Sequence, residues 1–171
     1  MRKNIFAAFT IFVCFILQAT LFSQFTVGGI RPNLLMIAVA SLGFWGGKRT
    51  GIYAGFFSGA LLDISFGYFY GLNAMLYMYA GYFCGYLKKY IYSKDIKMPL
   101  LFIAGSDLTY SLVYYFLVFV LRGNFHFAFY LKNLILPEMV YTTIMACLIY
   151  PLLHMMMMYL DRKEKGEQPV V

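Results

Sequence analysis

The sequence predicts an all-α membrane protein with six transmembrane helices. Of its 171 residues, 62% are hydrophobic and only 12% are charged, and the apolar residues form long runs separated by short polar or basic segments. A soluble domain of ordinary composition could not cover this much apolar surface. In a soluble protein a formal charge of +7 would suggest a nucleic-acid partner. Here the places of the lysines and arginines along the chain account for the charge, so we expect no nucleic-acid partner.

The first apolar run covers residues 5–25 and follows Met1-Arg2-Lys3. A short basic start before an apolar run is also typical of a cleaved signal peptide. However, this run is close to the ~20 residues that span a bilayer, and no clear small-x-small cleavage site follows a shorter core. We therefore interpret it as the first span.

The second run, residues 33–46, begins after Arg31-Pro32, where proline can open a helix because its missing N–H would be unpaired there anyway. At ~1.5 Å per residue this helix falls short of a ~30 Å hydrocarbon core. To cross the membrane, this helix must include flanking residues, be supported by neighbouring helices or lie where the lipid is locally thin. A tight basic turn then leads into the third span, residues 50–66.

An aromatic turn of the kind found at membrane interfaces precedes the fourth span, residues 72–87. The fifth span is expected at 98–121 and the sixth at 131–160, with kinks at Pro137 and Pro151. The segment 122–130 alternates aromatic with small or polar residues and should lie flat in the interface. We expect residues 1–160 to form one membrane domain and 161–171 a charged, disordered cytoplasmic tail.

The distribution of basic residues predicts the orientation. With a cytoplasmic N-terminus, the inner segments hold all but three of the 14 lysines and arginines, and the outer loops hold Arg31, Arg122 and Lys132. This asymmetry agrees with the positive-inside rule at every loop. It predicts a multi-pass membrane protein with both termini on the cytoplasmic side.

Small residues recur every four positions on two neighbouring helices. Gly51, Gly55 and Gly59 lead to Asp63 on the third span, and Gly81 and Gly85 lie four apart on the fourth. Such spacing mostly means close helix packing, and it can also mark a partner-binding face. Because a period of four overshoots 3.6, the stripe winds around its helix and favours a right-handed crossing, most simply against Gly81 and Gly85.

Three carboxylates fall inside predicted spans, where an ionised group costs at least ~2–3 kcal/mol. Asp63 is either hydrated or hydrogen-bonded to Ser65 or a turn amide, or it is a functional residue. Asp107, near Ser106 and Thr109, is expected to be locally hydrogen-bonded or protonated inside the bundle rather than a transport residue. Glu138 follows Pro137 and is expected to cap backbone freed by the kink.

The sequence contains no motif for catalysis, metal or cofactor binding. His126 and His154 lie far apart, and neither is paired with a nucleophile. We expect His126 at the interface and His154 in a packed or inner-interface environment. Cys14, Cys84 and Cys147 lie in apolar runs without metal-binding spacing, so we interpret them as small lipid-facing or helix-facing residues.

Several short motifs together resemble a known family. They are Arg31-Pro32-Asn33-Leu34-Leu35, the stripe Gly51, Gly55, Gly59 with Ala60-Leu61-Leu62-Asp63, Gly71-Leu72, Gly81-Tyr82 and Gly85. This pattern resembles the rod shape-determining protein MreD, mainly over residues 31–87. Asn33 departs from it, because the family often has aspartate after the proline, and this puts in doubt any function that needs the carboxylate.

The resemblance implies a non-enzymatic component of the bacterial elongation complex. MreD-like proteins sit in the bacterial cytoplasmic membrane with MreC and connect the MreB filament on the inside to the peptidoglycan synthases RodA and its penicillin-binding transpeptidase. The resemblance also implies the six-helix architecture of the substrate-binding subunits of energy-coupling-factor vitamin transporters.

Two functional hypotheses follow. In the first, the protein is a membrane scaffold whose glycine faces and outer turns, including Pro32, Asn33 and Gly71, dock MreC and other partners, and whose basic inner loops meet a cytoskeletal or anionic lipid surface. In the second, it is a small-solute or vitamin-binding subunit with Asp63, Asp107 and Glu138 lining an outward pocket. The scaffold accounts better for the short loops, and the binding subunit accounts better for three carboxylates.

Overall fold

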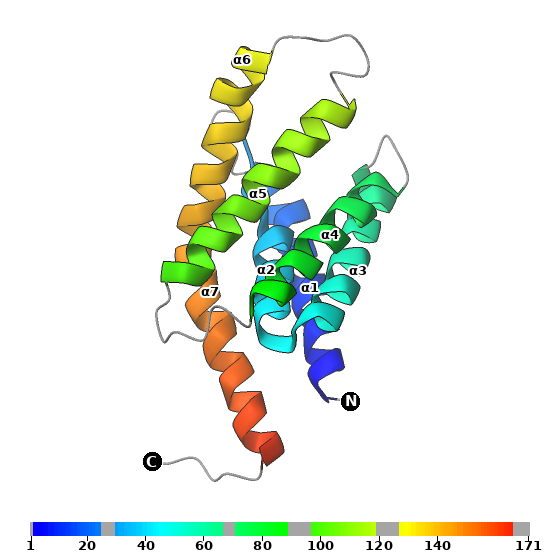
Figure 1. Cartoon of the computed structure of the whole chain (residues 1–171), viewed down its shortest axis with the longest axis vertical. Coiled ribbons are helices and arrows are strands. Elements are labelled where there is room, and N and C mark those ends of the chain that lie inside the picture. The colour runs from blue at the N-terminus through cyan, green and yellow to red at the C-terminus, as the bar shows by residue number, and fades with distance from the viewer. Residues whose placement is uncertain (1, 25–29, 67–70, 89–96, 119–126, 166–171) are drawn as a thin grey trace.

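The computed structural model describes residues 2–24, 30–66, 71–88, 97–118 and 127–165, and its regular structure in these ranges is helical. The long helices alternate in direction along the chain, so that α1 begins and α7 ends in the lower part of the view in Figure 1. The elements are α1 (Arg2–Gln24), α2 (Leu34–Gly46), α3 (Lys48–Phe66), α4 (Leu72–Leu87), α5 (Lys97–Val118), α6 (Phe127–Tyr130), a π-helical turn (Leu131–Ile135) and α7 (Leu136–Lys165).

Helix α2 is the centre of the bundle. Every residue from Leu34 to Phe44 is buried, and α2 packs against α1, α3, α4, α5 and α7. A helix that is apolar all round can be buried on every side. The second apolar run can be short because the neighbouring helices enclose it.

The outer faces of the surrounding helices carry exposed apolar and aromatic side chains, such as Phe57 (59% exposed) on α3 and Leu148 (69%) on α7. Within the described residues, two helical stretches are long and apolar enough to cross a membrane: Met98–Val118 and Phe127–Arg162. Two shorter apolar helices are Ile5–Thr20 and Leu34–Gly46. The protein is thus helical with apolar outer faces, while the six crossings and the orientation stay predictions.

The glycine stripe of α3 lies directly on α4. A Cβ added to Gly51 would lie 2.1 Å from the Gly81 carbonyl oxygen, and one added to Gly55 would lie 2.1 Å from the Tyr77 carbonyl oxygen. At Gly59 the added atom would lie 2.4 Å from the Cα of Ala74. These glycines let two backbones meet, which is the closest kind of helix contact.

Gly85 continues the same contact at the start of α3. An added Cβ there would lie 2.6 Å from the main-chain nitrogen of Lys48. The structure therefore assigns these glycines to packing within the chain, and their faces are not open to a partner. The handedness of the crossing stays a prediction.

The chain entering α7 differs from the prediction for 122–130. Phe127–Tyr130 is helical and continues through the π-turn into α7, so a flat interfacial segment is wrong for these residues, and 122–126 lie outside the described ranges. The π-turn ends just before Pro137, whose ring removes the amide that would bond the carbonyl of Asn133. Pro151 lies inside α7.

The prediction that a disordered tail begins at residue 161 is also wrong, because the last helix extends beyond that residue. Helix α7 continues through Asp161 to Lys165, and Asp161 accepts a 2.7 Å hydrogen bond from the Trp45 indole nitrogen at the end of α2. Arginine, lysine and glutamate are good helix formers, and the bond to Trp45 fixes the helix at this level. Residues 166–171 lie outside the described ranges.

Candidate functional site

Asn33 joins four helices, three through its buried side chain and the fourth through its main-chain N–H. As the N-cap of α2, its Oδ1 accepts hydrogen bonds from the Met36 amide (3.1 Å) and from the Tyr77 hydroxyl of α4 (2.6 Å). Its Nδ2 donates to Asp107 of α5 (3.0 Å), and its main-chain N–H donates to the Thr142 hydroxyl of α7 (3.0 Å). Since each partner comes from a different helix, this network fixes their relative positions.

Asp107 is fully buried, as expected, but its partner is not local. One carboxylate oxygen accepts from Asn33, and the other has no hydrogen-bond partner among the described residues. The Ser106 hydroxyl lies 3.3 Å from the Cys84 sulfur, and the Thr109 hydroxyl donates to the Gly105 carbonyl oxygen at 2.7 Å. A local hydrogen bond to Ser106 or Thr109 is therefore the wrong expectation.

Asp63, at the end of α3, caps the beginning of α4. Its two oxygens accept hydrogen bonds from the main-chain amides of Gly71 (3.0 Å), Asn73 (3.2 Å) and Ala74 (2.9 Å), and from the Asn73 side-chain amide (2.9 Å). The carboxylate thus satisfies amides that a helix start leaves unpaired, and its negative charge suits the positive end of the helix dipole. Gly71 makes the turn possible with a φ of 95°. Of the two interpretations of Asp63, the turn-amide one matches this geometry.

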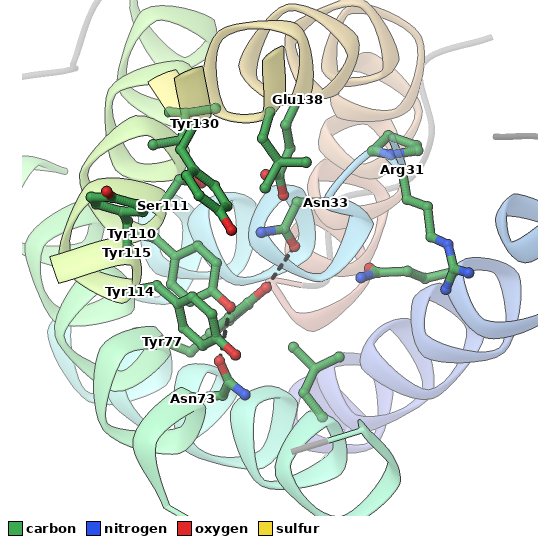
Figure 2. Close-up of a pocket in the computed structure, with 15 residues that line it drawn as sticks. Arg31, Asn33, Asn73, Tyr77, Tyr110, Ser111, Tyr114, Tyr115, Tyr130 and Glu138 are labelled. Carbon is green, nitrogen blue, oxygen red and sulfur yellow. Dashed lines mark hydrogen bonds between the residues drawn. The ribbon is translucent and has the colours of Figure 1, made fainter. Parts of the chain in front are cut away.

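A cavity of about 350 Å³ lies beside the Asn33 network, and Figure 2 shows the side chains around it. Its walls come from the segment that precedes α2 and from α1, α3, α4, α5, α6, the π-turn and α7. The lining residues are Gln18, Arg31, Pro32, Asn33, Leu62, Asn73, Tyr77, Tyr110, Ser111, Tyr114, Tyr115, Tyr130, Leu134, Ile135 and Glu138.

Comparison with known families then decides the identity of the chain. The family model described as rod shape-determining protein MreD matches residues 1–160. The chain belongs to the MreD family. Its members are cell-shape-determining membrane proteins, and the family is a structural one. No curated protein and no solved structure matches the chain.

In this MreD-family chain, Glu138 is the one carboxylate among the described residues that line the cavity. It accepts no hydrogen bond within the described part of the chain, so the expected capping of backbone freed by Pro137 is not seen there. Asp63 and Asp107 do not line the cavity, because the first caps α4 and the second lies behind Asn33. The expectation that all three carboxylates line a pocket is therefore wrong for Asp63 and Asp107.

The tyrosines are the feature of this MreD-family site that the sequence interpretation missed. The rings of Tyr77 and Tyr110 meet edge to face at 4.9 Å, and those of Tyr115 and Tyr130 lie 5.1 Å apart. The Tyr110 hydroxyl donates to Asn73 Oδ1 at 2.8 Å. The signal that could have found part of this cluster is Tyr110 and Tyr114, which lie four apart on the fifth apolar run and so share one helix face.

The remaining titratable candidates lie away from the cavity. His154 is exposed and stacks on Tyr150 with ring centroids 5.8 Å apart, while His126 lies outside the described ranges. Cys14 and Cys84 are buried and Cys147 is exposed. Among the described residues, no three histidine, cysteine or acidic side chains are placed to hold a metal ion.

Proposed function

We propose that this protein is the cytoplasmic-membrane component of the bacterial elongation complex that binds MreC. In this role it helps to couple the MreB cytoskeleton to peptidoglycan synthesis by RodA and its penicillin-binding transpeptidase. The observation that carries the proposal is the family match over residues 1–160. The complex would hold the protein as a scaffold without chemistry of its own.

The basic side chains at one end of the bundle support contact with the cytoplasmic side. Lys48 lies 4.4 Å from the ring centre of Tyr86, and Lys88 donates to the Trp45 carbonyl oxygen at the end of α2. These contacts hold cations near the end of the bundle where α1 begins and α7 ends (Figure 1). Such a surface suits anionic lipid headgroups or an acidic partner.

The MreC contact needs a face that the fold leaves open, and the glycine faces are covered. An apolar groove of about 730 Å³ runs between α1 and α3 and is lined by Ala8, Phe12, Tyr53 and Phe57 among others. Ala8 is exposed, and small residues allow close approach of a second helix in a membrane. We assign this groove to a membrane segment of MreC, as part of the same proposal.

Co-purification from native membranes tests this function. MreC and the synthases should be recovered with the wild-type protein and identified by mass spectrometry. Ala8→Leu should fill the groove and reduce MreC recovery without disturbing the fold, because Ala8 is exposed. Ala128→Leu, on the equally exposed Ala128 of α6, is the matched control and should leave recovery unchanged. Equal MreC recovery with both variants would contradict the assignment of the groove to MreC. Absence of MreC from the wild-type sample would contradict the proposed function itself.

The cavity favours a second candidate, the small-solute or vitamin-binding subunit of an energy-coupling-factor type transporter. Its volume of about 350 Å³ lies within the range of small-molecule sites. The same co-purification separates the two, because a transport subunit would bring an ATPase motor and a bound small molecule instead of MreC.

A further inference from the structure

We propose that the cavity binds a zwitterionic group that carries an ammonium and an acidic moiety, of which a phosphoethanolamine head is the simplest example. The inference does not depend on MreC binding, because a scaffold and a transport subunit could both use such a site. It is carried by the two charged residues that line the cavity and by the aromatic and amide groups that line it with them.

Glu138 supplies the anionic end of the site. The fold uses the two other membrane-level carboxylates for its own contacts, since Asp63 caps α4 and Asp107 holds Asn33. Glu138 has no such partner within the described residues and points toward the cavity in Figure 2. A carboxylate kept at this depth without a structural contact is suited to a charged ligand.

Arg31 supplies the cationic end. It is exposed and lines the same cavity from the segment before α2. In the described part of the chain it forms no ion pair with Glu138 or with another acid. Two opposite charges that share a cavity without neutralising each other leave both available, and a ligand with both charges would satisfy both.

The other groups that line the cavity fit an ammonium. The aromatic walls include Tyr77, Tyr110 and Tyr130, and the faces of such rings attract cations. Gln18 uses its Oε1 to accept from the Leu35 amide at 3.1 Å, which leaves its NH₂ group as a donor for an acidic oxygen. Among the described residues that line the cavity, Arg31 is the one lysine or arginine that could repel a cation.

The ligand can be soluble or can be the head of a membrane lipid, and two arms of one experiment distinguish these sources. In the first arm, protein in nanodiscs of phosphatidylglycerol alone is titrated with O-phosphoethanolamine by calorimetry. In the second arm, protein in nanodiscs with equal phosphatidylethanolamine and phosphatidylglycerol is released for native mass spectrometry, and the lipid that stays bound is identified. Saturable binding in the first arm assigns a soluble ligand, and retention of phosphatidylethanolamine in the second alone assigns a lipid head.

Variants make either result specific. Glu138→Gln should weaken binding roughly ten- to hundredfold, as expected when a charged hydrogen-bond partner is lost. Arg31→Gln should weaken it by about tenfold or more, and it leaves the fold intact because Arg31 is exposed. Lys132→Gln removes an exposed charge outside the cavity and should bind like the wild type. Ethanolamine and glycerol phosphate, which each keep one of the two charges, should bind more weakly than O-phosphoethanolamine.

The proposal is overturned if neither arm shows binding, or if Glu138→Gln and Arg31→Gln bind as the wild type does. MreC co-purification with both variants should be unchanged. A failure of the zwitterion site therefore differs from a failure of the scaffold function, which would appear as loss of MreC from the wild-type sample.

Discussion

The Asn33 side-chain amide donates a 3.0 Å hydrogen bond to Asp107, and both residues are buried. The amide of Asn33 can donate a hydrogen bond to an ionised Asp107. An ionised carboxylate at position 33 has no proton to donate and could not form this bond. Asn33 lies where the resemblance led us to expect aspartate, and in this chain its amide has an acceptor in Asp107.

Asn33→Asp should destabilise the protein. The substitution removes the donor and places a second carboxylate against Asp107, and such a buried, unpaired charge costs about 3 kcal/mol. Thermal unfolding in detergent would show a lower midpoint. Asn133→Asp, on an exposed residue, is the control and should have little effect. Equal midpoints for the two variants would contradict the role given to the Asn33–Asp107 bond.

Gly55→Ala and Gly105→Ala should have opposite outcomes although both glycines are in helices. The new methyl group at Gly55 would lie 2.1 Å from the Tyr77 carbonyl oxygen, whereas nothing lies within 4 Å at Gly105. Overpacking against backbone should cost about 3 kcal/mol or prevent folding, while the exchange at Gly105 should stabilise by up to about 1 kcal/mol. Unfolding midpoints of the two purified variants are the measurement, and a tolerated Gly55→Ala would disprove the close contact.

Asp63→Ala should loosen the start of α4. Loss of the cap leaves the amides of Gly71, Asn73 and Ala74 without their acceptor and should cost about 2 kcal/mol or more. Hydrogen exchange at these amides should become faster, and Asp63→Asn, which keeps one acceptor oxygen, should give an intermediate rate. Ser65→Ala, on an exposed neighbour, should exchange as the wild type does. Unchanged exchange in Asp63→Ala would point back to a functional rather than a structural aspartate.

Asp161→Ala should change the fluorescence of the protein, because Trp45 is its one tryptophan and donates to Asp161. Loss of a hydrogen bond to a charged group should cost about 1.5–3 kcal/mol and shift the emission maximum. Arg162→Ala removes an exposed adjacent side chain and should leave the emission as it is. Identical spectra for both variants would show that α7 is not held to α2 at this level.

The contact between α3 and α4 could be predicted because its signal is local. Gly51, Gly55 and Gly59 lie four apart, and their helix is followed directly in the sequence by the helix that they meet. The helices also follow the apolar runs closely until residue 122, after which helical structure extends beyond both expected limits of the last run. The aromatic residues before position 131 suggested an interfacial segment, and the charged residues after position 160 suggested a disordered tail. The sequence therefore did not predict that both segments are helical.

The site could be predicted only in part, since its partners lie far apart in the sequence. Asn33 meets Asp107 and Thr142 across separations of 74 and 109 residues, and no period or spacing links them. The sequence predicts Glu138 as an intramembrane carboxylate, but its position at the cavity depends on where the fold places Asp63 and Asp107. What distinguishes the three acids is which helix ends and amides surround them, and this depends on the tertiary fold.

The enclosed position of α2 has a consequence for biosynthesis. This helix is made second, yet α5 and α7, which cover part of it, are made last. A chain stopped after Leu87 would leave that side of α2, and Asn33 at its start, without Asp107 and Thr142. The assembly of the bundle therefore finishes only when α7, the last helix to be made, packs against α2, the second.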